Sequence, residues 1–480
     1  MRLHDAFPLL LAAVLGFAFA FLISLYPLPG LTAPVAVGAM LLFALRPQWL
    51  LVAYFTSLAI PIQHTVAGLP VNATDALLVL WCGLWPLMMK RLDAPVLALW
   101  RPPTLVWLIT PFVLVVGVAQ IGSINPGASV KQVARVVEWF VLLPLALTAL
   151  RPDMRFYRFA GAALMIIPCL FAIDGLYEYL NDGQRLTGLL GISVPVPEGS
   201  DSQIRHTFDI SGRAGSSFGG AQGLAMYLVM TLGFSIAYIL YPPAPWMRRL
   251  GWLCLTLSVG GLAVAQSRGG LLGGVALLLA IALTLRPGLR WPLLLSVVFV
   301  TCVALVVIAQ WPGWDGSIAG LVPGRPEAVL DRLIIWGRVW DVMLDNPFFG
   351  VGLGNFRDAF FKREAWLHVA LAYPSLHAHN TYLELLADTG WLGLLAYVAF
   401  LLLVAWQLVR IWNRPGPRPV LTLAAIGSLA AYVVFAMVDM LLLQNIHMLL
   451  VLVLSLGLTT PGSPMVGVRS DGAAHVKAPL

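Results

Sequence analysis

The amino-acid sequence predicts an all-α polytopic membrane protein, and three observations support that fold class. First, 60% of the 480 residues are hydrophobic and only 11% are charged, whereas soluble domains carry about 25% charged residues. Second, apolar runs that approach the ~20 residues of a membrane-spanning helix recur from one end of the chain to the other. Third, the polar turns between these runs fall into two sets, one rich and one poor in arginine and lysine.

Fourteen apolar segments can be distinguished, and because several are short we expect about 12–14 complete spans. They lie at about residues 8–26, 31–45, 49–63, 73–89, 103–121, 130–150, 156–180, 218–241, 250–266, 270–285, 291–310, 380–410, 419–440 and 443–460. The first has no small-residue cleavage site after it, so we interpret 7–26 as a spanning helix rather than a removable signal peptide.

The distribution of basic residues predicts the orientation. With a cytoplasmic N-terminus, most basic turns fall on the inner side, whereas the outer turns at 27–30, 64–72 and 441–442 carry no lysine or arginine. This asymmetry follows the positive-inside rule and places both termini in the cytoplasm. The net charge of +7 therefore reflects membrane topology, and we expect no nucleic-acid partner.

The same orientation predicts the domain organisation. We expect spanning helices over 1–310 with an outer loop at 181–217, a large periplasmic loop region at 311–379, further spanning helices over 380–460 and a disordered cytoplasmic tail at 461–480. Helical patterning in 327–345 and around 356–371 predicts a short helical periplasmic cap over the membrane core. The glycine-rich stretch 346–356 between them predicts a tight reverse turn.

The candidate site begins at the sequence His377-Ala-His379-Asn380-Thr381, where a polar loop meets a long apolar run. Apolar residues then recur at helical spacing, so the histidines lie at or just before a helix start. Asn380 or Thr381 could cap that helix. Its first turn has unpaired N–H groups and the positive end of the dipole, which suit anionic groups. The alternative is a set of ordinary polar residues at the membrane interface.

Arginines that break the outer-loop pattern are the second group of candidates. Arg268 stands at a glycine-flanked outer turn, and Arg332 has apolar helical neighbours. Each arginine either snorkels toward water or holds an anion. Arg338 is a further candidate for substrate binding, with a loop salt bridge as the alternative.

Two i, i+4 pairs near the outer surface complete the candidates. Lys131 and Arg135 present two cations on one helix face, although Glu138 could neutralise Arg135. Asp174 and Glu178 also share a face, and they either help to bind a sugar or cap the following loop. No metal-ligand spacing and no phosphate-binding loop is present, so we expect no metal and no cofactor.

Four features resemble the O-antigen ligase family of polytopic glycosyltransferases, which also takes in O-antigen polymerases and protein O-oligosaccharyltransferases. They are Ser267-Arg268-Gly269, Arg332-x-x-x-Trp336, Asn346-Pro347…Gly350-x-Gly352-x-Gly354-Asn355-Phe356, and His379-Asn380-x-x-Leu383…Gly390-x-x-Gly393. With a matching topology, the resemblance covers roughly 210–440. It implies a GT-C-like bundle in the bacterial inner membrane, with a periplasmic site that transfers a glycan from undecaprenyl pyrophosphate without a metal.

Within that family we expect an inverting ligase that uses a sugar hydroxyl of lipid A–core as acceptor. Because the acceptor hydroxyl must lose a proton, His379 is our candidate general base, since an unperturbed imidazole titrates near pH ~6.5. His377 is the alternative base or an orienting partner, and Arg268 and Arg332 clamp the pyrophosphate. The open alternatives are a polymerase or protein-directed enzyme of the same superfamily and, from another class, a transporter of lipid-linked sugars.

Overall fold

A computed structural model describes residues 63–66, 69–72, 103–149, 154–186, 213–216, 220–285, 291–292, 295, 327–363, 377–416, 419–439 and 446–459. Within this part of the chain every element is a helix except one hairpin. The hairpin pairs β1 (Gln63–Val66) antiparallel with β2 (Leu69–Asn72), and it occupies the predicted outer turn at 64–72.

The described helices overlap the predicted apolar segments, except α15 (Glu327–Asp345) and α16 (Phe356–Arg363), which lie in the predicted loop region at 311–379. They are α5 (Thr104–Ala119), η2 (Gln120–Gly122), α6 (Pro126–Val137), η3 (Glu138–Leu142), α7 (Leu143–Ala149), α8 (Met154–Leu180), α11 (Ala221–Leu240), α12 (Pro245–Ala265), α13 (Arg268–Thr284), α15 (Glu327–Asp345), α16 (Phe356–Arg363), α18 (Thr381–Trp412), α19 (Val420–Phe435) and α20 (Ile446–Leu458). The predicted spans at 8–26, 31–45, 49–63, 73–89 and 291–310 and the tail at 461–480 lie wholly or almost wholly outside the described residues.

Four described helical stretches are long and apolar enough to cross a membrane. They are Thr104–Gly122, Phe156–Leu180, Ala221–Leu240 and Thr381–Trp412. Shorter apolar helices are Arg268–Thr284, Val420–Phe435 and Ile446–Leu458. The predicted class of a helical membrane protein is therefore confirmed for the part of the chain that the structure describes.

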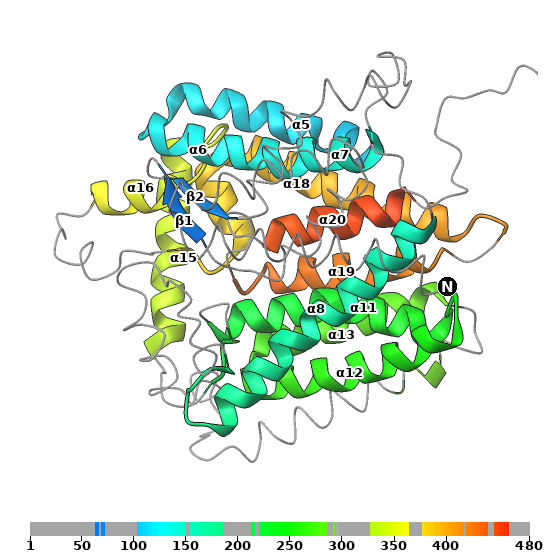
Figure 1. The fold of residues 1–480 in the computed structure, drawn as a ribbon. Coiled ribbons are helices and arrows are strands. Elements are labelled where there is room, and N and C mark those ends of the chain that lie inside the picture. The colour runs from blue at the N-terminus through cyan, green and yellow to red at the C-terminus, as the bar shows by residue number, and fades with distance from the viewer. Residues whose placement is uncertain are drawn as a thin grey trace, which may run out of the picture.

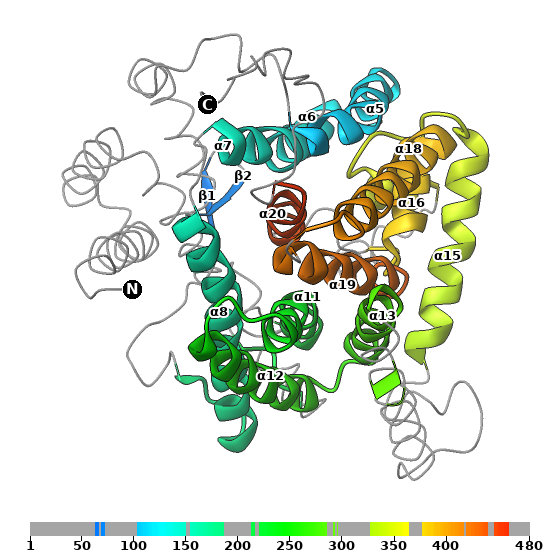
Figure 2. The same cartoon turned by 90° about the vertical axis from the view of Figure 1, so that its right-hand side faces the viewer.

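Helix α11 lies near the middle of the bundle, where it packs against α8, α12, α13 and α19 (Figure 2). Its side chains are buried along most of its length because it has neighbours on several sides. At Gly233 a Cβ atom would collide with the Ala424 carbonyl of α19. Close approach at small residues is typical of helices in membranes. Lipid tails are as apolar as the side chains, so the hydrophobic effect does not drive helices together and close packing does.

Polar side chains also join helices inside the bundle. The Tyr397 and Tyr432 hydroxyls lie 2.6 Å apart, and the Tyr432 hydroxyl lies 2.8 Å from Nε2 of His447. These three residues belong to α18, α19 and α20. Since each polar group has a partner, the core contains hydrogen bonds without leaving these hydroxyls unsatisfied.

Two helices lie at one end of the bundle, at the left of Figure 1. Helix α15 runs across the direction of the bundle helices, and α16 follows it after a glycine-rich turn. The bounds of α15 match the predicted helix at 327–345, and its buried residues Ile335, Val339 and Val342 form a small separate core with Phe356 and Ala387. This end of the molecule contains the candidate site.

Candidate functional site

The start of α18 positions the two histidines. Asn380 caps the helix, because its Oδ1 accepts hydrogen bonds from the backbone N–H groups of Tyr382 at 3.0 Å and Leu383 at 3.1 Å. The predicted cap is therefore confirmed at Asn380. Thr381 instead ties the helix to the turn after α19, since its N–H and hydroxyl both donate to the Asp439 carbonyl. His377 and His379 thus project from a segment that is held at its C-terminal end.

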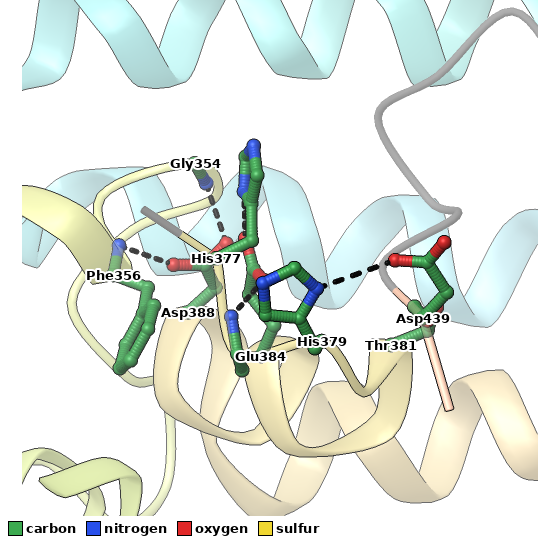
Figure 3. A network of polar contacts seen from close by, with 9 residues as sticks. Gly354, Phe356, His377, His379, Thr381, Glu384, Asp388 and Asp439 are labelled. Carbon is green, nitrogen blue, oxygen red and sulfur yellow. Dashed lines mark hydrogen bonds and ion pairs between the residues drawn. The ribbon is translucent and has the colours of Figure 1, made fainter. Parts of the chain in front are cut away.

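Each histidine has one ring nitrogen directed at a carboxylate (Figure 3). Nδ1 of His377 lies 3.2 Å from Oε1 of Glu384, and Nδ1 of His379 lies 3.6 Å from Oδ1 of Asp439. Glu384 is buried in the first turn of α18, and its second oxygen accepts the Ala378 N–H at 2.9 Å. Both histidine side chains keep 40% of their surface exposed, so they remain accessible to a substrate.

The environment of His377 favours its protonated form. Burial lowers the pKa of His377, but the hydrogen bond and charge of Glu384, together with the charge of Asp439, outweigh burial and the opposing charge of Arg357. The net result is a pKa above the ordinary value. His377 is therefore held toward its protonated form and is less suited to accept a proton at neutral pH.

His379 has a backbone conformation that is uncommon for a residue with a side chain. Its φ is +48°, in the left-handed region. Such a conformation is disfavoured for L-residues and persists where the surroundings impose it, often at functional sites. Here the cap at Asn380 and the Thr381 contacts impose it, and they set the imidazole beside Asp439.

The glycine-rich stretch between α15 and α16 forms a turn that packs against α18; the sequence predicts the turn but not this contact. Asp388, buried in the second turn of α18, accepts the N–H of Gly354 at 2.7 Å and that of Phe356 at 2.8 Å. Gly390 interrupts the helix with φ +66° and ψ −170°. The Trp391 N–H then donates to the Pro347 carbonyl, so the turn is hydrogen-bonded to α18 directly after the break.

Helix α15 connects the histidines to the arginines. The indole N–H of Trp336 donates to the Ala378 carbonyl at 2.8 Å, between the two histidines. Arg332 lies one helical turn before Trp336, and its charge acts on Arg268 at the start of α13. The Arg268 side chain is exposed, and Ser267 caps its helix by accepting the Gly270 N–H at 3.1 Å. One helix therefore brings both predicted groups to the same end of the bundle.

Arg213 is a third guanidinium at this end that the sequence interpretation missed. Its Nε donates to the Ala265 carbonyl at 3.2 Å, three residues before Arg268. Burial lowers the pKa of Arg213, and the positive charge of Arg268 lowers it further. Arg213 lies in the predicted outer loop at 181–217 together with Arg185 and Arg205, so its position in the sequence alone does not single it out.

Asp174 and Glu178 on α8 anchor the ends of that loop. Glu178 accepts the N–H groups of Gly215 at 3.0 Å and Ser216 at 2.6 Å, and its other oxygen pairs with Arg185 at 3.3 Å. Asp174 accepts the Ser216 hydroxyl and the Leu186 N–H. Of the two alternatives for this pair, the structure favours loop capping over sugar binding. The same hydrogen bonds fix the loop that carries Arg213 next to α12.

The remaining candidates lie on α6 and α15. Arg135 pairs with Glu138 at 3.5 Å and lies over the Trp139 ring at 5.9 Å, so the structural pairing considered from the sequence is present. Lys131 is half-buried on the same helix. Arg338 pairs with Asp341 at 3.2 Å on an exposed face. Both ion pairs join residues three positions apart in the chain.

Comparison with known proteins identifies a family over the central part of the chain. Residues 252–398 match the family model described as O-antigen ligase. The matched segment includes Arg268, Arg332 and both histidines, so the four features that resemble this family in the sequence are all inside it. Members of the family are glycosyltransferase-like enzymes. No curated protein matches the chain.

Proposed function

We propose that this chain, a member of the O-antigen ligase family, transfers a glycan from undecaprenyl pyrophosphate to a sugar hydroxyl of lipid A–core at the periplasmic face of the inner membrane. The observation that carries this proposal is the role of α15. One residue of that helix bonds between the two histidines, and another, one turn away, exerts its charge on Arg268. A proton acceptor and phosphate-binding groups at one end of a membrane bundle are what the reaction needs.

His379 is the general base of the proposed reaction. The acceptor hydroxyl gives its proton to His379, and the oxygen forms a new bond to the anomeric carbon as the bond from that carbon to the pyrophosphate oxygen breaks. Asp439 beside Nδ1 would stabilise the imidazolium that results. This single displacement inverts the anomeric centre. His377, whose pKa is raised chiefly by the hydrogen bond to Glu384 against the effect of burial, instead supplies positive charge.

The arginines stabilise the leaving group. As the glycosidic bond breaks, negative charge grows on the pyrophosphate, and guanidinium groups bind phosphate oxygens bidentately while staying charged. Arg268 and Arg332 are the proposed clamp, and Arg213 adds a third cation. Loss of one such contact typically costs about 10²–10³ in rate. Because the guanidinium groups carry this charge, the proposal needs no metal, and a chelator should leave the rate unchanged.

The test is transfer by the purified protein in detergent with lipid-linked glycan as donor. Lipid A–core, a growing polysaccharide and a Ser/Thr-containing protein are offered separately, and mass spectrometry measures which acceptor gains mass. Gain only by lipid A–core supports the ligase, whereas gain only by another acceptor replaces it with a polymerase or a protein-directed enzyme. Movement of the glycan lipid across liposomes without any product supports a transporter instead.

Variants test the residue roles within the same assay. We expect His379→Ala and Arg268→Ala each to abolish transfer while the protein still inserts and accumulates. Arg249→Ala, an exposed arginine at the start of α12, is the matched control and should transfer normally. Normal transfer by a site variant would remove that residue from the proposed mechanism.

A further inference from the structure

A strip of exposed apolar side chains lies at the same end of the bundle as Arg332 and Arg268. It combines one edge of α15, the turn after it and the first residues of α18 beyond the Gly390 break. We define the apolar strip as Trp340, Leu344, Phe348, Trp391, Leu392 and Leu395. Exposure is high at Leu344, with 69%, and at Phe348, with 64%, so no residue in the described part of the chain covers these side chains.

The strip is continuous in space. The rings of Trp340 and Trp391 have centroids 6.3 Å apart, which joins α15 to α18. The backbone N–H of Leu392 donates to the Phe348 carbonyl at 3.3 Å, which joins the turn to α18. Leu344 and Leu395 each lie one helical turn beyond one of the two tryptophans. The residues therefore form one surface rather than scattered exposures.

One ridge of α15 leads from the arginines to this strip. Arg332, Trp336, Trp340 and Leu344 are spaced four residues apart and form a row that turns slowly around the helix. The first two are half-buried against the bundle, whereas Trp340 is 44% and Leu344 69% exposed. The row covers about 18 Å from the cation to its apolar end.

We propose that the polyprenyl chain of the donor lies along the apolar strip, with its pyrophosphate at Arg332 and Arg268. This inference rests on the proposed function and names the part of the site that takes the lipid. The chain is bonded directly to the pyrophosphate, so it must leave the site at the arginines, and the ridge leads from there to a surface that is apolar and open. Lipid A–core is the poorer occupant, because its core sugars separate the acyl chains from the reacting hydroxyl.

Beyond the strip, α18 continues as a membrane-spanning stretch with exposed Leu402 and Leu403. The strip therefore connects the arginines to the lipid-facing side of the bundle. A donor could move from the bilayer to the site along one surface without detaching its tail from apolar contacts. This continuity favours a lipid chain over a soluble ligand as the occupant.

The experiment compares donors that differ only in tail length. One carries the glycan on undecaprenyl pyrophosphate and the other on a two-isoprene pyrophosphate that is soluble in water. The variant is Leu344→Ala with Phe348→Ala. The matched control is Leu253→Ala with Val259→Ala, two apolar residues that are 57% and 53% exposed on α12, away from α15 and α18. KM and kcat are measured for both donors with each protein.

We expect the strip variant to raise KM for the long donor about five- to tenfold, in the range for lost hydrophobic contacts, with little change in kcat. KM for the short donor should stay as in the wild type, and the control should behave as the wild type with both donors. An equal change for both donor lengths, or an equal change in the control, would overturn the proposal. The second of these results would mean that only general contact with lipid matters.

A binding measurement separates this inference from the proposed function. The dissociation constants of undecaprenyl pyrophosphate and of the short prenyl pyrophosphate are measured directly, without any acceptor. If the wild type transfers no glycan yet the strip variant weakens only the long lipid, the proposed reaction fails and the lipid site stands. If transfer occurs but the strip variant binds both lipids as the wild type does, the lipid site fails alone.

Discussion

Gly390 provides the most direct test of how the site is assembled. With φ +66° and ψ −170° it occupies a region that only glycine populates readily. A Cβ atom at this position would overlap the backbone of Phe348 and Phe349. Because backbone atoms are the obstacle, no rotation of a side chain can relieve the overlap. Gly390→Ala must therefore either strain α18 or push the turn at 347–352 away from it.

The expected loss of stability has two parts. The strained backbone costs about 1–3 kcal/mol, and forcing an extra methyl group into a packed position costs about 1–3 kcal/mol more. The sum is about 2–6 kcal/mol. Gly337→Ala on α15 is the matched control, since nothing lies near its Cβ position and alanine in a helix should stabilise by about 0.5–1 kcal/mol.

Thermal unfolding in detergent measures the difference. Both variants and the wild type are heated at one scan rate, because large proteins often unfold irreversibly and the midpoint then depends on that rate. We expect a midpoint several degrees lower for Gly390→Ala and one equal or slightly higher for Gly337→Ala. Equal midpoints for the two alanine variants would refute the claim that the break in α18 is built around a glycine.

Two further predictions concern charge. The folded-state pKa of His377 is raised by Glu384 against the opposing effect of burial, so the stabilisation is present below the ordinary histidine pKa of about 6.5 and lost as pH rises through the folded value. The difference in thermal midpoint between wild type and Glu384→Gln should thus narrow toward alkaline pH, and a difference that widens would contradict this sign. Arg213→Ala should weaken binding of undecaprenyl pyrophosphate about tenfold or more, and Arg213→Lys should recover part of the lost affinity. The control Arg249→Ala should bind the lipid as the wild type does. A normal affinity in Arg213→Ala would show that Arg213 does not bind the pyrophosphate.

Local chemistry made much of this end of the molecule predictable. The bounds of α15 follow from its apolar periodicity, and α18 begins where the Asn380 cap indicates, because both signals depend only on neighbours in the chain. The break at Gly390 was not predictable in the same way. Its glycine fits the helical spacing, and the reason for the break is the distant turn at 347–352, which the spacing does not reveal.

The arginine group shows the same limit. Arg268 and Arg332 stand out because their own surroundings are apolar or glycine-rich. Arg213 is set apart only by contacts between distant segments: Glu178 on α8 binds the N–H of Gly215, 37 residues away, and Arg213 binds the Ala265 carbonyl at the end of α12. Long-range hydrogen bonds to loop backbone leave little mark on local composition, so sequence patterns locate helices better than the loops pinned between them.

The buried acidic residues at this end share one role, which is to accept hydrogen bonds from the backbone. Asp174, Glu178, Glu384 and Asp388 each accept at least one backbone N–H, and they hold the outer loop, the histidine segment and the glycine-rich turn in place. A carboxylate used in this way fixes the position of a loop, and the N–H groups that donate to it partly offset its negative charge. These acids therefore hold the backbone of the segments that carry the histidines and Arg213. Replacing Glu178 by Gln should consequently lower affinity for undecaprenyl pyrophosphate through the position of Arg213, although Glu178 itself would never touch the lipid. If Glu178→Gln binds the lipid normally while Arg213→Ala binds it weakly, Arg213 binds the lipid but does not depend on Glu178 for its position.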